Sequence, residues 1–147
     1  MQILIDGDAC PVTGIAVKVA GEFGIPAVLI SDTNHSFHIP GVEWVPVDPG
    51  ADSADLALAN RCRAGDAVIT QDYGVAALAL GKRAYAIHPS GMIYTDGNID
   101  TVLAERHTAQ KLRRSGRAHL KGPSKRTADD DRAFETAFRQ LIAEGRK

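Results

Sequence analysis

Cysteine, aromatic residues and long hydrophobic runs are all scarce in this chain. Its two cysteines, Cys10 and Cys62, stand in unrelated contexts, which excludes a disulfide framework and a cysteine-rich metal centre. No apolar run approaches the roughly 20 residues that span a bilayer, and no basic region of the kind that opens a signal peptide is present. The 147 residues therefore predict a single domain in the cytoplasm, with free, buried thiols and no membrane partner.

Acidic residues are nearly absent from one basic segment of the chain, residues 105–126. From Glu105 to Arg126 there are eight Lys or Arg and one acid, so this segment carries +7 and the remaining chain −8. A protein that works on a polyanion needs such an arrangement, although a solvated helix and loop would show it too. No aromatics are interleaved, so base stacking is not indicated. We predict that nucleic acid, RNA rather than DNA, contacts Arg113, Arg114, Arg117, Lys121, Lys125 and Arg126.

Short apolar runs alternate with amphipathic stretches, which is typical of an α/β protein with a mostly parallel sheet. We expect strands at 3–5, 27–30, 43–47, 67–70 and 84–87, and Pro46 places the third at an edge of the sheet. Helices are predicted at 12–23, 53–64, around 75–79, from Ile99, and at 130–144. A basic, mobile loop is expected at 115–128. The last helix has an acidic cap at 129–131 and an apolar face formed by Phe134, Phe138, Leu141 and Ile142.

Two carboxylates, Asp6 and Asp8, directly follow the first apolar run. Open α/β sheets bind ligands at the carboxyl ends of their strands, so this acidic turn marks a candidate site. Pro11 suits the first turn of the helix that follows. An Asp before a helix is more commonly a cap, and its functional meaning depends on whether other carboxylates reach the same edge.

Further acids are predicted to reach that edge. Asp55 shares a helix face with apolar Leu58, where burying an unpaired charge costs free energy. Asp52 is predicted to cap the same helix, and its side chain could reach the same edge. Asp72 leaves the strand 67–70, although it could also cap the next helix. Asp66 enters the same strand more than ~10 Å away, so we assign it a structural role.

Like charges gathered from separate segments repel one another unless a cation is present, and oxygen ligands favour Mg²⁺ or Mn²⁺. Such an ion activates water for attack on a phosphodiester, with one ion or two. We predict Asp6, Asp8, Asp55 and Asp72 as catalytic residues, and these four together with Asp52 as metal ligands. Thr70 is predicted to orient Asp72, a water or a ligand.

Four sequence motifs carry a resemblance to a known family: residues 6–11 (DGDACP), 54–55 (AD), 65–72 (GDAVITQD), and 122–123 (GP) with 131–134 (DRAF). Together they resemble the YaiI/YqxD family over nearly the whole chain. The resemblance implies a three-layer α/β/α sandwich of the PIN-like and NYN nuclease type. By the PIN pattern the first-strand acid falls on Asp6, the helical acid on Asp55, and the Thr-x-Asp acid on Asp72.

The chain departs from that family at two places. The usual Asp-Ala-Asp has Gly7 at its centre here, and the usual Asn-Pro-Arg-Gly turn is residues 88–91, His-Pro-Ser-Gly. The second change removes a basic residue that could have touched phosphate, which weakens the case for a substrate role of this turn.

The resulting hypothesis is a metal-dependent nuclease, and two alternatives stay open. A nucleic-acid-binding or regulatory module with a degenerate site would use only the basic segment. A haloacid-dehalogenase-like phosphatase would use Asp6 as nucleophile, Asp8 as acid and base, and Thr70 as phosphate ligand. Ala9-Cys10 after the acidic turn is unusual for that class.

Overall fold

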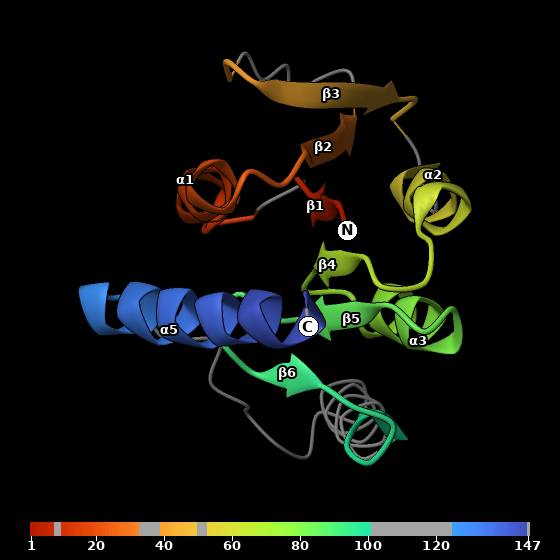
Figure 1. Ribbon diagram of the computed structural model, residues 1–147. Coiled ribbons are helices and arrows are strands. Elements are labelled where there is room, and N and C mark those ends of the chain that lie inside the picture. The colour runs from red at the N-terminus through yellow and green to blue at the C-terminus, as the bar shows by residue number, and fades with distance from the viewer. Residues whose placement is uncertain (8–9, 33–38, 50–52, 101–124, 147) are drawn as a thin grey trace, which may run out of the picture.

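The computed structural model describes residues 1–7, 10–32, 39–49, 53–100 and 125–146 (Figure 1). Strands and helices alternate along most of this part, as the sequence predicts. The elements are β1 (Ile3–Asp6), α1 (Thr13–Phe23), β2 (Ala27–Asp32), β3 (Val42–Val47), α2 (Ser53–Arg61), β4 (Ala67–Ile69), α3 (Tyr73–Gly81), β5 (Tyr85–Ile87), β6 (Ile93–Tyr94) and α5 (Ala128–Gly145).

The strands form one six-stranded sheet in the order β3-β2-β1-β4-β5-β6. The first five run parallel and β6 runs antiparallel to β5. The prediction of an α/β fold with a mostly parallel sheet is confirmed. So is the edge position of β3, where Pro46 costs no ladder hydrogen bond on the outer side.

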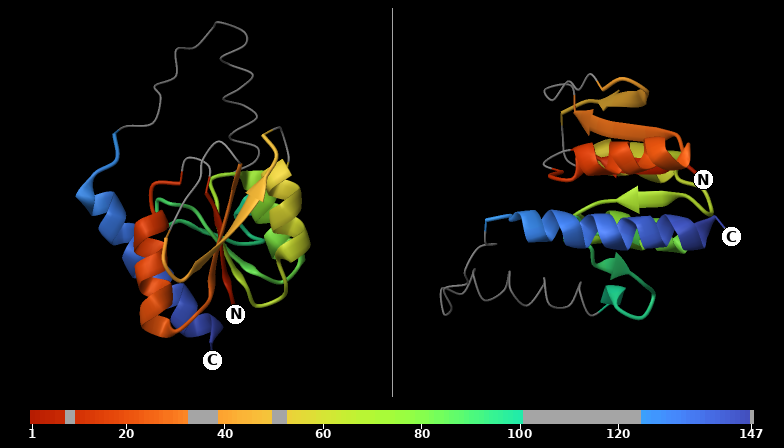
Figure 2. Two further views of the ribbon diagram at one scale, coloured as in Figure 1. Left: turned by 90° about the horizontal axis from the view of Figure 1, so that it is seen from above. Right: turned by 60° about the vertical axis from the view of Figure 1, so that its left-hand side comes forward.

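Helices cover both faces of the sheet: α1 and α5 lie on one side, α2 and α3 on the other (Figures 1 and 2). The first strand shows why. Ile3 and Ile5 belong to the core cluster beneath α1 and α5, whereas Leu4 belongs to the cluster beneath α2 and α3. Successive side chains of a strand point to opposite faces, so a strand covered on both sides is a continuous apolar run.

The helix α5 is the longest in the described chain and packs against α1. Its predicted apolar face is confirmed, because Phe134, Phe138, Leu141 and Ile142 are all buried. The expected cap at 129–131 needs correction. Thr127 is the N-cap, and its side chain and that of Asp130 each accept the other residue's backbone N–H in a capping box. The helix therefore begins at Ala128, two residues earlier than expected.

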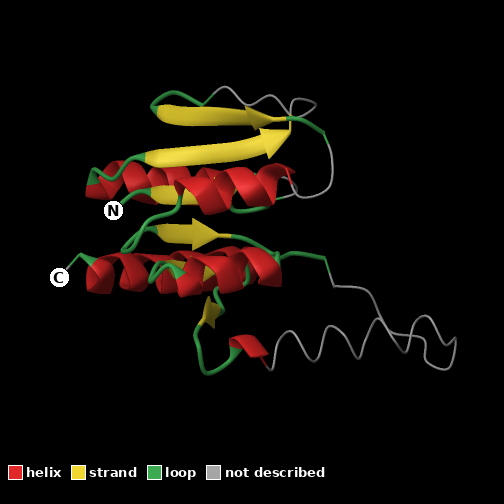
Figure 3. Ribbon diagram, turned by 90° about the vertical axis from the view of Figure 1, so that its right-hand side faces the viewer, coloured by secondary structure: helices red, strands yellow, loops and turns green. Residues whose placement is uncertain are grey.

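Both chain termini lie on the side of the sheet where the parallel strands begin, which we call its amino edge (Figure 3). The candidate carboxylates lie where the parallel strands end, at the carboxyl edge of the sheet, because Asp6 ends β1 and Asp72 follows β4. Residues 115–124, most of the predicted basic loop, fall outside the described residues. The described remainder, Lys125 to Thr127, has no regular structure, and Ala128 already belongs to α5.

Candidate functional site

The central strands β1 and β4 define a topological switch point. They are neighbours in the sheet, with Ile5 beside Ile69, but α1 carries the chain from β1 towards β2 while α3 carries it from β4 towards β5. The two connections diverge at the carboxyl ends of these strands, which is the position where open α/β sheets bind ligands. Asp6 and Thr70 occupy these two strand ends.

Thr70 joins the two acidic segments of the site. Its hydroxyl donates a 2.9 Å hydrogen bond to Oδ2 of Asp6 and accepts one of 2.9 Å from the backbone N–H of Asp72. The residue is only 1% exposed, and its own backbone N–H donates to the carbonyl of Ile87. The Asp6 carboxylate is thereby fixed relative to the turn that opens α3.

Asp72 has the capping role that the sequence allowed for. Its Oδ1 accepts hydrogen bonds from the backbone N–H groups of Gly74 (2.8 Å) and Val75 (3.2 Å), which satisfies two donors at the start of α3. The side chain is exposed, so this role and a contact with a ligand are sterically compatible.

Asp55 lies in the first turn of α2. This helix follows β3 and leads into β4, so its first turn is at the same edge of the sheet as Asp6. Within the described ranges, however, no group of three or more His, Cys, Asp or Glu is placed to hold a metal ion. Asp6, Asp55 and Asp72 thus share an edge without forming such a group, and Asp8 and Asp52 lie outside the described residues. The metal site stays a prediction.

Gly7 is required by close packing behind the site. Its N–H donates to the carbonyl of Ile30 at 2.8 Å, which carries the chain across the end of β2. A Cβ at this position would lie 2.7 Å from Cδ1 of Leu29 and 3.1 Å from the Ile30 carbonyl oxygen. A glycine at position 7 therefore fits against the side chain of Leu29.

Cys10 is half-buried and follows the acidic turn. Burial raises the pKa of its thiol, against smaller opposing effects of hydrogen bonds with Thr13 and Val12, and the Asp6 carboxylate adds a further small increase. The thiol is therefore protonated at neutral pH and is not a reactive thiolate. Cys62 is buried, and both cysteines are free.

His88 is a polar residue of this edge that the sequence analysis did not select. It directly follows β5, and its Nδ1 accepts the backbone N–H of Ser90 at 2.9 Å, with the Ser90 hydroxyl at the same distance. A neutral ring with Nδ1 as acceptor carries its proton on Nε2. Burial, helped by the charge of Arg126, lowers the pKa of His88.

The contact between Nδ1 of His88 and the Ser90 N–H has the sequence offset of an Asx turn. An Asn side-chain oxygen that accepts the N–H two residues later forms an Asx turn. Nδ1 of His88 supplies that acceptor at the same sequence offset. The signal was present in the sequence, as a polar residue followed by Pro at a strand end, but only the ring geometry assigns its role.

Two of the six predicted nucleic-acid-binding residues are described. Lys125 is exposed. Arg126 donates to Asp131 at 2.6 Å and to the carbonyl of Pro89 at 2.9 Å, so it ties the start of α5 to the turn after β5. This gives Arg126 a structural role in addition to any contact with nucleic acid. Arg113, Arg114, Arg117 and Lys121 lie outside the described residues.

Asp66 lies at the opposite edge of the sheet and has a structural role, as expected. It is 5% exposed and accepts hydrogen bonds from Gln2 N (3.1 Å), Gln2 Nε2 (3.0 Å) and Arg63 N (2.9 Å). The Arg63 contact closes the turn between α2 and β4. It accounts for α2 ending at Arg61 rather than at residue 64.

Fold and site together define an α/β protein with a mostly parallel sheet and a hydrogen-bonded carboxylate at its switch point. The model of a family described as "Uncharacterized BCR, YaiI/YqxD family" matches residues 4–144, and the chain belongs to this family.

Relatives at high identity support the assignment. A UPF0178 protein of Clostridium acetobutylicum is 54% identical over 147 residues, covering 99% of each chain. UPF0178 proteins of Clostridium kluyveri and Alkaliphilus oremlandii are 46% and 48% identical, covering 99% and 92% of this chain and 95% and 86% of their own. No solved structure matches. Among the described residues, no helix has the length and apolar content needed to cross a membrane.

Proposed function

We propose that this protein is a divalent-metal-dependent nuclease of the PIN-like type that hydrolyses phosphodiester bonds, with RNA as its substrate. The observation that carries the proposal is the Thr70 bridge at the switch point. It holds the Asp6 carboxylate at 2.9 Å and the turn of Asp72 at 2.9 Å from a single buried hydroxyl. The bridge supports the proposal because hydrolytic sites orient their carboxylates through hydrogen bonds from neighbouring residues.

The donor chemistry of the edge fits a hard cation. The acids predicted there offer only oxygen, which is the ligand atom that Mg²⁺ and Mn²⁺ prefer. Asp6, Asp8, Asp55 and Asp72, with Asp52 as a further candidate, would hold Mg²⁺ or Mn²⁺. When bound, the ion supplies an activated water and neutralises charge that develops on the leaving oxygen.

The protein's own residues have separate tasks in this proposal. Thr70 orients Asp6 through its hydroxyl and positions Asp72 through the backbone. The basic residues from Arg113 to Lys125 attract and align the phosphate chain, and this contribution weakens as salt rises. Arg126 supports the site indirectly, since it fixes α5 to the turn after β5.

The test uses the purified full-length protein with a fluorescently labelled single-stranded RNA and the matching DNA. Cleavage of RNA is expected with Mn²⁺ or Mg²⁺, and none in EDTA. Asp6→Asn should lower the rate by more than the ~10–100-fold typical of a residue that only supports a metal ligand. The matched control is Asp96→Asn, an exposed acid after β6, which should keep the wild-type rate.

Metal binding is followed separately by electron paramagnetic resonance of Mn²⁺. The proposal requires that Asp6→Asn weaken Mn²⁺ binding and Asp96→Asn leave it unchanged. If Asp6→Asn instead binds RNA as well as the wild type, and neither protein cleaves it, the chain is a binding module. The phosphatase alternative is disfavoured by the buried hydroxyl of Thr70, whose hydrogen bonds to Asp6 and Asp72 already engage it within the fold.

A further inference from the structure

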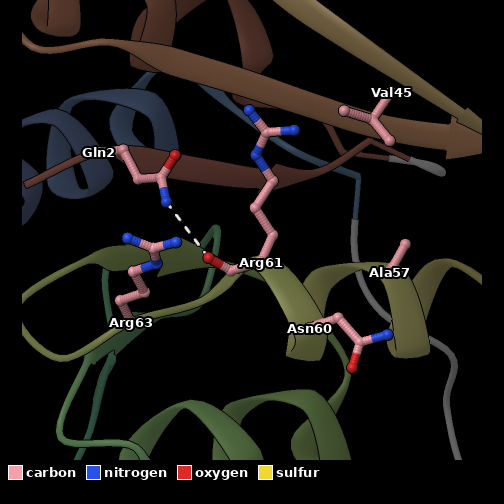
Figure 4. A pocket seen from close by; sticks show the side chains of 6 residues that line it. All are labelled: Gln2, Val45, Ala57, Asn60, Arg61 and Arg63. Carbon is pink, nitrogen blue, oxygen red and sulfur yellow. Dashed lines mark hydrogen bonds between the residues drawn. The ribbon is translucent and has the colours of Figure 1, made fainter.

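A cavity of about 570 Å³ opens at the amino ends of the strands, on the opposite edge of the sheet from Asp6. It lies between α2 and the strands β1 and β3, and is lined by Gln2, Val45, Ala57, Asn60, Arg61 and Arg63 (Figure 4). Its volume is within the range of small-molecule sites, ~300–1,000 Å³. None of these residues belongs to the site proposed above.

Two arginines, Arg61 and Arg63, give the cavity a positively charged lining. Figure 4 shows Arg61 between Gln2 and Arg63 on one side and Val45 and Ala57 on the other. A guanidinium is a planar fork of donors that matches the oxygens of phosphate, and two forks from one short segment can grip a single phosphate group. Arginines around a concave surface therefore indicate an anionic ligand rather than a cationic one.

The polar side of the cavity is held in place before any ligand arrives. Buried Asp66 accepts hydrogen bonds from the backbone N–H of Arg63 and from both nitrogens of Gln2. The Gln2 amide also donates to the carbonyl of Arg61 at 3.3 Å, the contact drawn in Figure 4. The backbones that carry both arginines are thus fixed to one carboxylate, which lowers the entropic cost of binding.

The carboxylate of Glu43 would compete with a bound phosphate for the guanidinium of Arg61. This carboxylate pairs with Arg61 through two contacts, of 2.6 and 2.7 Å, while 54% of the Glu43 side chain is exposed. The pair is bidentate but open to water, so a dianionic phosphate, which also fits the fork of donors and carries more charge, can compete with the carboxylate for Arg61. Arg63 is exposed on the surface of the turn before β4.

We propose that this amino-edge cavity binds a phosphate monoester of mononucleotide size. Arg63 and Arg61 hold the phosphate, with Arg61 released from Glu43. Val45 and Ala57 supply an apolar wall for a ring system, and Asn60 supplies an amide for its polar edge. The inference is independent of the nuclease proposal, because it uses no residue of the carboxyl edge.

Isothermal titration calorimetry of the full-length protein tests this with AMP, CMP, GMP and UMP, and with adenosine and citrate as comparison ligands. The four nucleotides should bind, whereas adenosine lacks the phosphate and citrate lacks the ring. Arg63→Ala should weaken AMP binding about tenfold or more, and Arg63→Lys, which keeps the charge but loses the fork, should lie between. Glu43→Gln should tighten binding, because Arg61 loses its competitor.

The matched control is Arg132→Ala, which removes the same charge from an exposed position on α5. It should bind AMP as the wild type does, and so should Asp6→Asn, which separates this site from the proposed nuclease. Thermal unfolding of each variant checks that the fold is intact. The proposal is overturned if no nucleotide binds the wild type at millimolar concentration, if citrate or adenosine binds equally well, or if Arg63→Ala and Glu43→Gln both leave the affinity unchanged.

Discussion

The hydroxyl of Thr70 donates a hydrogen bond to the carboxylate of Asp6 although the two residues are 64 positions apart in the chain. The contact spans the pairing of β4 with β1, and the same hydroxyl accepts the N–H of Asp72. One buried oxygen thus sets the relative position of two acidic segments. Its removal should affect chemistry and stability in separable ways.

Thr70→Val keeps the shape of the side chain and removes the hydroxyl. The Asp72 N–H and the Asp6 carboxylate then both lose a partner, so we expect the free energy of unfolding to fall by ~1–3 kcal/mol. In the nuclease assay the rate should fall by ~10–100-fold. Urea unfolding and RNA cleavage measure the two effects. Thr70→Ser restores the hydroxyl, and a serine variant as impaired as the valine variant would contradict the role assigned to it.

Asp66→Ala should destabilise the amino edge. It leaves Gln2 N, Gln2 Nε2 and Arg63 N without their acceptor, and an unsatisfied buried donor costs ~1–3 kcal/mol. We expect a loss of at least ~2 kcal/mol in chemical denaturation. The control Asp96→Ala removes an exposed acid and should stay within ~0.5 kcal/mol of the wild type. Equal stabilities of the two variants would show that the hydrogen bonds of Asp66 do not stabilise the fold.

Gly7→Ala and Gly21→Ala should change stability in opposite directions. At position 7 the new Cβ would meet Leu29 at 2.7 Å and the Ile30 carbonyl at 3.1 Å, and such overpacking costs ~1–3 kcal/mol. At position 21, inside α1, nothing lies within 4 Å, so alanine should add ~0.5–1 kcal/mol through helix propensity. Thermal unfolding compares them. A stabilised Gly7→Ala variant would refute the close approach of β1 to β2.

His88 should make stability depend on pH in mildly acidic solution. Burial lowers its folded-state pKa below the ~6.5 of an unfolded chain, so the unfolded state binds more protons as the pH falls. The contribution of His88 is therefore complete above about pH 6.5 and decreases as the pH falls through that value towards the folded-state pKa.

The measurement compares His88→Asn with the wild type by urea unfolding at several pH values. Asparagine keeps an acceptor for the Ser90 N–H but does not titrate, so the variant should lose less stability between pH 7.5 and 5.5. Nitrogen NMR of the wild type should show the neutral ring protonated on Nε2. An Nδ1-protonated ring, or identical pH profiles, would contradict this assignment.

The comparison of sequence with structure separates two kinds of prediction. The positions of the five parallel strands, the edge position of β3 and the buried face of α5 followed from local periodicity and from one proline, whereas the antiparallel strand β6 was not predicted. The capping residue of α5 was misplaced, because Thr127 and the acids after it are all acceptable caps and only the backbone geometry selects one. The PIN-like assignment, the metal and the nuclease activity stay predictions.

By itself the sequence determined which residues are buried, since apolar side chains that recur with the period of a strand or helix must face a core. It also placed Asp6 and Asp72 at one edge of the sheet and Asp66 at the other, because strand direction fixes which end each occupies. Only the tertiary structure decided that β1 lies beside β4, and with it the Thr70 bridge. It likewise decided the His88 tautomer and the two-arginine cavity of the amino edge. Strand pairing and side-chain contacts join residues far apart along the chain, and local patterns carry no record of which distant partners meet.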